Sequence, residues 1–330
     1  MRRRDFIAFV GAASMLPAVA HGRSSKVHRM AILHPSHPVT ELNELSRFRY
    51  YREFFRELRR LGYVEGSNLS IERFSGEGRV DGYPKLASDA AARNPDVVFA
   101  ISVSLVLAMK QATLMVPIVA MTSDPVGHGI AASIARPGGN ITGVTVDPGL
   151  ELWAKRIELL REIAPKISKL GILATRANPE AAAMRDAADE AGITVMGPSS
   201  VDNGSEEEYR NVITTMSLTG TDALFVDGSP EHITKRHLIV ELAAKSRLPT
   251  IYPFRSFVEA GGLVAYGIDL VEIFRRAAGA IDQVLKGSKP ADIPFYQPTK
   301  FELVINRAAG REIGVTFSEQ LLARADEVIE

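Results

Sequence analysis

The chain has 330 residues, which is long for a single hydrophobic core and suits two domains. Its 39 basic and 39 acidic side chains balance to a formal charge of zero, so composition gives no support for a nucleic-acid-binding or anionic-membrane-binding surface. Cysteine is absent, which excludes disulfides, thiol nucleophiles, thiolate metal sites and a lipid-modified cysteine anchor.

The N-terminus has the pattern of an export signal. Arg2-Arg3-Arg4 precede an apolar run of about 15 residues, too short for a comfortable membrane span, and Ala18-Val19-Ala20 is a small-x-small cleavage site. The series Arg3-Arg4-x-Phe6-Ile7 resembles the twin-arginine signal; a general-secretion signal and an uncleaved anchor are the alternatives. We therefore expect cleavage near Ala20 and a periplasmic protein, and we leave residues 1–20 out of the fold.

Residues 28–146 alternate between apolar strands and amphipathic helices, which predicts an α/β lobe with a parallel sheet and right-handed crossovers. The predicted strands span 29–33, 68–74 and 96–101, and the predicted helices span 40–61, 83–92 and 105–113. Ligands of open α/β sheets bind beyond the carboxyl ends of strands. Ser36, Ser102 and Ser104 follow strands in this way and are candidate ligand-binding residues.

His34 and His37 form an H-x-x-H pair in the turn after the first strand. Without a third ligand or a Glu in helical register this pair is weak support for a metal, and we expect no metal site. Two interpretations stay open for the turn: it contributes Ser36 or His37 to a ligand pocket, or it is merely exposed.

Residues 117–146 predict a strand, a short helix and a second strand. The first strand ends at Thr122 and Ser123, and Asp124–Pro125 is a favourable helix start because Asp caps free N–H groups and Pro suits the first position. Pro137-Gly138-Gly139 ends the helix. Thr122, Ser123 and Asp124 are therefore candidate ligand-binding residues.

The second lobe, residues 147–262, repeats this pattern. Predicted strands at 170–174, 193–196, 223–226 and 249–252 alternate with helices, and Ser205 to Glu208 is a capping box. Asn178–Pro179 and Ser229–Pro230 again place helix starts after strands, where free N–H groups suit a carboxylate, although each cap also simply satisfies its own helix. The candidates here are Asn178, Asp227 and Ser229.

The chain then returns to the first lobe. A strand at 263–268 and a helix at 270–285 precede a final strand at 301–305 and helices at 306–313 and 318–329. We assign 28–146 plus about 264–290 to the N-terminal lobe and 147–262 plus about 291–330 to the C-terminal lobe. Candidates near the return are Tyr252, Tyr266 and Asp269; the tyrosines are equally explained as core residues and Asp269 as a helix cap.

Four segments carry a family resemblance: PIVAMTSDPVGHGIAASIARPGGNITGV (117–144), LRRLGYVEGSNLSIE (58–72), IYPFRSFVEAGGLVAYGIDL (251–270) and PTKFELVINRAAGREIGVTF (298–317). They resemble the substrate-binding proteins of ABC transporters, in the subfamily with members assigned to tryptophan and other aromatic amino acids. The resemblance implies two Rossmann-like lobes with parallel sheets, joined by a three-segment hinge, as in type I periplasmic binding proteins.

The resemblance also implies a function. It indicates a monomer that binds a small molecule in the interlobe cleft and delivers it to a permease in the inner membrane. The ligand would be an amino acid, aromatic or otherwise, or a related organic acid. In that picture Ser104, Thr122, Ser123 and the helix starts take the carboxylate, Asp269 takes the ammonium, and tyrosines line the side-chain pocket.

The sequence contains none of the common motifs for nucleophilic, metal-dependent or nucleotide-dependent catalysis that we sought, so we expect a binding protein without cofactors rather than an enzyme. The main alternative is a periplasmic sensor subunit that uses the same fold for signalling. A repressor-type regulator is disfavoured by the export signal, and no residue constellation predicts an exported hydrolase or isomerase.

Overall fold

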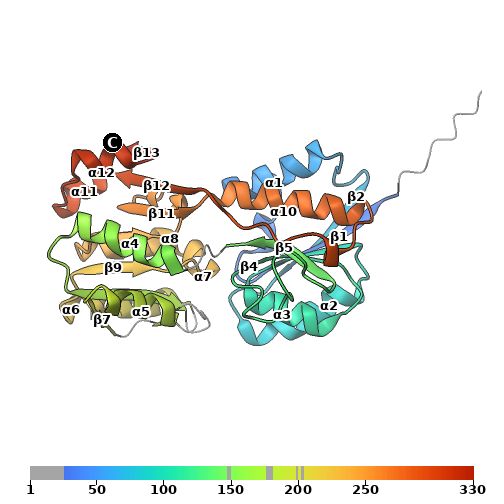
Figure 1. The fold of residues 1–330 in the computed structure, drawn as a ribbon, viewed down its shortest axis with the longest axis horizontal. Helices are drawn as coiled ribbons and strands as arrows, with labels where there is room; N and C mark the ends of the chain where they lie inside the picture. The colour runs from blue at the N-terminus through green and yellow to red at the C-terminus, as the bar shows by residue number, and fades with distance from the viewer. Residues whose placement is uncertain (1–25, 147–149, 176–180, 198–199, 202–203) are drawn as a thin grey trace, which may run out of the picture.

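The computed structural model describes residues 26–146, 150–175, 181–197, 200–201 and 204–330. Two α/β lobes lie side by side along the long axis of the molecule, and each is a sheet covered by helices on both faces (Figure 1). This confirms the expected fold class of two lobes with largely parallel sheets. Within the described residues, no helix has both the length and the apolar content needed to cross a membrane.

The sheet of the first lobe is entirely parallel, in the order β2-β1-β3-β4-β5. Its strands are β1 (His28–His34), β2 (Leu69–Ser75), β3 (Val97–Ile101), β4 (Ile118–Thr122) and β5 (Ile141–Thr145). Every residue of β3, β4 and β5 is buried, as parallel strands covered on both faces require.

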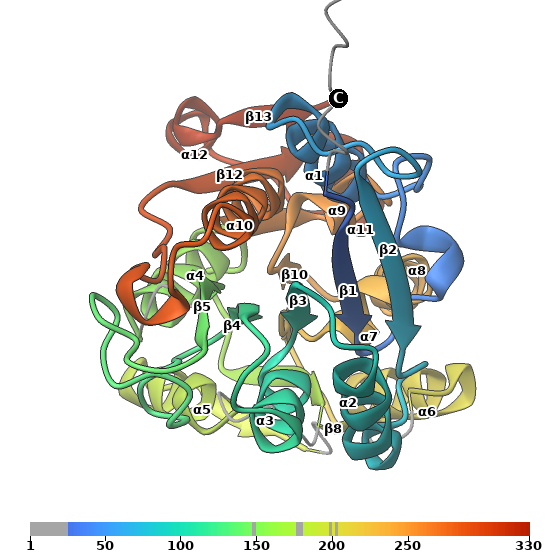
Figure 2. The same cartoon turned by 90° about the vertical axis from the view of Figure 1, so that its right-hand side faces the viewer.

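Four long helices cover this sheet. They are α1 (Arg49–Arg60), α2 (Tyr83–Ala92), α3 (Val103–Ala112) and α10 (Leu270–Leu285). Helices α1 and α10 share one face, where Tyr50, Tyr51 and Phe54 pack on Phe274, and α2 and α3 cover the other (Figure 2). Aromatic packing therefore ties a late helix of the chain to the first one.

The second sheet has the order β13-β12-β11-β10-β9-β6-β7, with β8 also paired to β6, and only the β11–β12 pair is antiparallel. Its strands are β6 (Lys169–Thr175), β7 (Thr194–Met196), β8 (Ser200–Val201), β9 (Ala223–Val226), β10 (Thr250–Tyr252), β11 (Val264–Ile268), β12 (Phe301–Asn306) and β13 (Glu327–Ile329).

Helices again divide between the two faces of this sheet. One face carries α4 (Leu150–Ile163), α5 (Ala181–Glu190), α11 (Arg307–Ile313) and α12 (Glu319–Arg324). The other carries α6 (Glu206–Leu218), α7 (Pro230–Thr234), α8 (Arg236–Lys245) and α9 (Arg255–Val258).

The chain passes between the lobes after β5, after β11 and before β12. The second passage differs from the expected boundary at 264, because β11 pairs with β10 and β12 in the second sheet and only α10 packs on the first lobe. The third lies after Tyr296, whose backbone pairs with β5 of the first lobe through Gly143 and Thr145. Both lobes are thus assembled from separated parts of the sequence.

The helix expected between Pro125 and Arg136 is wrong; turns occupy this segment. Asp124 has a positive φ of 28° and its carboxylate accepts the backbone N–H of Gly127, so it closes a local turn instead of capping a helix. Gly129, at φ 64°, stops any continuation.

Other helix predictions differ at their ends. The helix expected from residue 40 begins only at Arg49, and the one expected to reach 329 ends at Arg324 and is followed by β13. The capping box of α6 is confirmed, since the Ser205 hydroxyl accepts the backbone N–H of Glu208 at 3.2 Å.

Candidate functional site

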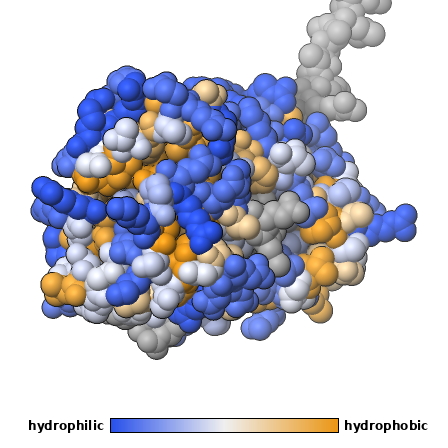
Figure 3. All heavy atoms as spheres, turned by 60° about the vertical axis from the view of Figure 1, so that its left-hand side comes forward, coloured by the Kyte–Doolittle hydropathy of each residue, from blue (hydrophilic) through white to orange (hydrophobic). Residues whose placement is uncertain are grey.

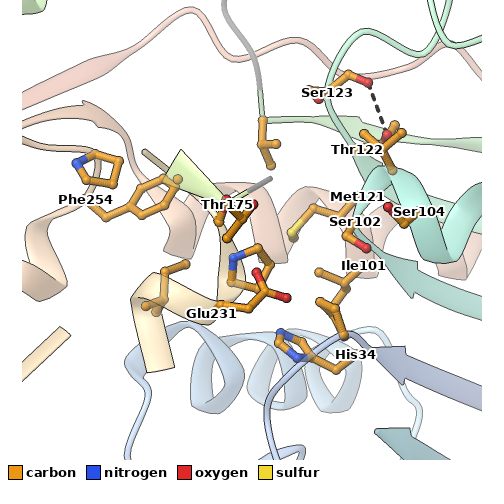
Figure 4. A pocket seen from close by; sticks show the side chains of 18 of the residues that line it. His34, Ile101, Ser102, Ser104, Met121, Thr122, Ser123, Thr175, Glu231 and Phe254 are labelled. Carbon is orange, nitrogen blue, oxygen red and sulfur yellow. Dashed lines mark hydrogen bonds between the residues drawn. The ribbon is translucent and has the colours of Figure 1, made fainter. Parts of the chain in front are cut away.

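A cavity of about 460 Å³ lies between the lobes. The carboxyl ends of β3 and β4 and the start of α3 form its wall on the first lobe, and α4, the end of β6 and α7 form its wall on the second. In Figure 4, Ser102, Ser104, Thr122 and Ser123 lie on one side, and Thr175, Glu231 and Phe254 lie on the other. Most of the remaining lining is apolar, including Met121, Leu152, Trp153, Ile268 and Phe274.

The first-lobe wall presents hydroxyl groups at a helix N-terminus. Ser102 caps α3, with its hydroxyl accepting the backbone N–H of Leu105 at 3.4 Å, and its φ of 90° is strained for a residue with a side chain. The Thr122 hydroxyl donates its one proton to the backbone carbonyl of Ser123 at 3.1 Å, so it would have to rotate away from this carbonyl to donate to a ligand. Together with Ser104, these groups fit a small carboxylate, since free N–H groups and hydroxyls donate to anions. All four are candidates from the sequence.

Ser229 is the corresponding candidate on the second lobe, and Asp227 holds it in place. The fully buried Asp227 carboxylate accepts the backbone N–H groups of Ser229 at 2.8 Å and Thr175 at 3.2 Å, and it lies 2.7 Å from Nδ1 of His232. The hydroxyls of Thr175 and Ser229 are 2.9 Å apart. Ser229 lines the cavity, whereas Asp227 lies behind it and supports the loop.

Glu231 also lines the cavity and was missed in the sequence. It is half-buried at the second position of α7, and burial raises the pKa of its carboxyl group above the ordinary range. An acid two residues after a helix cap is ordinary in sequence, because acids suit the first turn of any helix. Glu231 differs from an ordinary first-turn acid only because α7 faces the first lobe across the cavity.

Arg156 and Trp153 are adjacent on α4 and both line the cavity. The Arg156 side chain is 3% exposed; it donates to the carbonyls of Tyr266 at 2.7 Å and Pro253 at 3.3 Å, and its guanidinium lies 5.0 Å from the Trp153 ring centroid. Trp153 packs in the core of the second lobe and also lines the cavity. Arg156 was not predicted, because its helical spacing resembles that of any surface arginine.

The histidine turn forms another part of the wall. Nδ1 of His34 accepts the backbone N–H groups of Ser36 at 3.0 Å and His37 at 2.7 Å, so the neutral ring carries its proton on Nε2. Burial lowers the pKa of His34 well below its usual range and lowers that of His37 to about 3. The two rings stack at 4.1 Å. Among the described residues, no cluster of three or more His, Asp or Glu side chains is placed to hold a metal ion.

Two described candidates near the carboxyl edges, Ser36 and Asp124, do not line this cavity. Ser36 lies beside it, and its hydroxyl reaches the Thr234 hydroxyl of the second lobe at 3.3 Å. Asp124 is exposed in its own turn. Asn178 lies outside the described residues.

The three candidates near the return passage also do not line this cavity. Tyr252 is buried and stacks on Phe257 at 5.0 Å. Tyr266 offers its backbone carbonyl to Arg156, while its ring lies near Phe301. Asp269 caps α10 by accepting the backbone N–H of Val271 at 2.8 Å, so the helix-cap alternative describes its position.

Residues 42–329 match the family model described as ABC transporter substrate binding protein. A curated tyrosine-binding protein of Clostridioides difficile is 26% identical over 261 residues, covering 77% of this chain and 73% of that protein.

Solved structures show the same fold. The ABC domain from Streptococcus pneumonia in complex with L-Trp superposes with a TM-score of 0.79 and 25% identity, covering 92% of this chain and 100% of that one. A conserved domain protein from Vibrio cholerae gives a TM-score of 0.81 at 22% identity with the same coverage. A ligand-free, open substrate-binding protein from Clostridium difficile gives 0.60 at 20% identity, covering 92% of this chain and 99% of that one.

Proposed function

We propose, from the premise that this chain belongs to the family of ABC transporter substrate-binding proteins, that its ligand is an aromatic amino acid held between the two lobes. Membership of this family makes the chain a binding protein for a small molecule and a component of an ABC transporter, rather than an enzyme. The main support for an aromatic amino acid is the cavity itself, which combines a largely apolar lining with a few polar groups at its edges.

The size and chemistry of the cavity support a ring-bearing ligand. Its volume of about 460 Å³ is within the range of small-molecule sites. Met121, Trp153, Phe254 and Phe274 supply apolar and aromatic surface on which a planar side chain gains hydrophobic and stacking energy. The names of two relatives, one binding tyrosine and one solved with L-Trp, point to the same ligand class.

The carboxylate of such a ligand would bind at the first-lobe wall. Ser104 and Thr122 are the hydroxyls there, with Ser102 and Ser123, and the start of α3 adds free N–H groups and partial positive charge. The proposed ligand would therefore bind the first lobe through its carboxylate, and the rest of the ligand would extend across the cavity toward the second lobe. Contacts to both lobes stabilise the closed arrangement, which is how ligand drives hinge closure.

We place the protein in the periplasm, with a signal cleaved near Ala20, where the closed form docks as a monomer on a permease in the inner membrane. Figure 3 shows one face of the molecule, on which hydrophobic atoms are interspersed with hydrophilic ones.

A thermal-shift screen of residues 21–330 tests the ligand class. The panel holds the amino acids, deaminated aromatic acids, short branched acids and sugars. A ligand at about 100 times its Kd adds about 2.7 kcal/mol of stability, which raises Tm by several degrees. Shifts confined to aromatic amino acids and their close analogues are expected. A shift with sugars or aliphatic ligands and none with aromatic ones would overturn the proposed ligand class.

A further inference from the structure

We propose that Glu231 binds the ammonium group of the ligand and thereby makes the site selective for amines over the corresponding deaminated acids. This inference rests on the proposed function, because it assigns a second polar anchor to the same cavity. It replaces Asp269, which the sequence suggested for this role and which caps α10 instead.

Glu231 is the only carboxylate among the described residues that line the cavity. Figure 4 shows its carboxylate turned into the cavity, with Thr175 on the one hand and His34 on the other. It comes from the second lobe, opposite the hydroxyl-rich wall of the first. An amino acid whose carboxylate lies at Ser104 and Thr122 would therefore find its counter-charge on the opposing lobe.

Among the described residues, no cationic side chain forms an ion pair with the Glu231 carboxylate. Arg156, the one arginine of the described lining, donates to the carbonyls of Tyr266 and Pro253. His34 also lines the cavity, but its ring is neutral. A partly desolvated carboxylate without a counter-charge is unfavourable, so an ammonium that supplies hydrogen bonds and charge gains more here than in water.

The other titratable groups near Glu231 do not compete for this role. Asp227 and His232 lie on its own segment, with the Asp227 carboxylate 2.7 Å from Nδ1 of His232. Tyr83 of α2 and Tyr209 of α6 face it as phenols, since burial raises the pKa of each well above its ordinary value. Among the described residues of this lobe, Glu231 is thus the carboxylate placed to meet a cationic group of the ligand.

A pH dependence follows from the raised pKa of Glu231. The ionised carboxylate binds the ammonium, and the neutral acid does not pair with it. Affinity for an amino acid is therefore full at pH values above the pKa of the free protein and falls as the pH drops through it. The affinity for a deaminated analogue, which has no ammonium group, does not require Glu231 to be ionised.

Calorimetry on residues 21–330 tests the assignment with four probes: L-tryptophan, L-tyrosine, 3-indolepropionate and 3-(4-hydroxyphenyl)propionate. The wild type is expected to bind the amino acids more tightly than their deaminated partners. In Glu231→Gln, affinity for the amino acids should fall about 10- to 100-fold and the preference should disappear, in line with the loss of one charged hydrogen bond. The affinity of this variant for the amino acids should also no longer fall as the pH drops through the pKa of Glu231.

Asp269→Asn is the matched control, because Asn retains the cap of α10. It should leave both the affinity and the preference as in the wild type. Retained preference in a folded Glu231→Gln protein, or loss of preference in Asp269→Asn, would overturn the assignment. Should Glu231→Gln fail to fold, a wild type that binds both members of each pair equally at every pH would overturn it. Failure of all four probes would instead overturn the proposed function.

Discussion

The backbone N–H of His37 donates to Nδ1 of His34 at 2.7 Å, and this bond fixes the protonation of a cavity-lining imidazole. Because Nδ1 is an acceptor, the proton of the neutral ring is on Nε2, and protonating Nδ1 would break the turn that shapes the pocket. His37 stacks on the same ring and is itself almost fully buried. The pair is therefore a neutral structural element at physiological pH.

The stability of the protein should fall as the pH drops below about 6.5. Both imidazoles have lowered pKa values in the folded state, so the unfolded chain binds more protons below its own pKa, and each histidine removes up to about 1.4 kcal/mol per pH unit. Denaturant unfolding between pH 7 and 5 measures this slope. His37→Phe, which retains an aromatic ring, should reduce the slope by the share of one imidazole, up to about 1.4 kcal/mol per pH unit; an unchanged slope would show that His37 does not titrate on unfolding.

Ser104→Ala should weaken ligand binding without reducing stability. The Ser104 side chain lines the cavity at the start of α3, and losing one hydrogen bond to a carboxylate lowers affinity by about 10-fold. Ser70, exposed on β2 and remote from the cavity lining, supplies the matched control Ser70→Ala. Calorimetry that finds equal affinities for the two variants would place the ligand carboxylate elsewhere.

Trp153 should report ligand binding through its fluorescence. It is the only tryptophan in the chain, it lines the cavity, and the Arg156 guanidinium covers its ring. A titration with L-tyrosine under tryptophan-selective excitation should therefore give a saturable change in emission. Trp153→Phe should lose this signal while retaining the ligand-induced rise in Tm; an invariant wild-type emission at saturating ligand would contradict contact between ligand and ring.

Asp269→Ala should lower the free energy of unfolding by about 1 kcal/mol, the usual consequence of losing a helix cap. Its carboxylate accepts the Val271 backbone N–H, and the residue sits where the chain passes from β11 to α10. Denaturant unfolding checks the loss, and Asp269→Asn should recover most of it. A variant as stable as the wild type would mean that solvent satisfies the helix start equally well.

Part of the cavity could be predicted from the sequence because its residues follow strands. Ser102, Thr122 and Ser229 each come directly after or shortly beyond an apolar run, and the carboxyl ends of parallel strands lie at one edge of a sheet. The same reasoning included Asp124, and Tyr252 was a candidate because its ring could stack on a ligand; neither residue lines the cavity. Asp124 bonds within its own turn, and Tyr252 points into the core, two outcomes that position along a strand does not determine.

Glu231 and Arg156 could not be predicted in this way. Both are charged residues on helices, and their helical spacing is that of any solvated face. What makes them part of the cavity is the approach of the other lobe, which depends on the three passages of the chain rather than on local pattern. The lobe assignment of Val264 to Ile268 differed for a related reason, since an apolar strand pairs with whichever sheet edge the topology presents to it.

Packing of α10 on α1 also constrains how the protein is made. During synthesis the aromatic face of α1 leaves the ribosome early, yet Phe274, which packs on Tyr50 and Tyr51, follows only after most of the second lobe, from β6 to β11. The first lobe of a nascent chain is thus left with an uncovered apolar surface until translation is almost finished. Chaperone binding during synthesis should concentrate on that surface, and a ribosome-bound chain that stops before α10 should remain sensitive to protease in its first lobe.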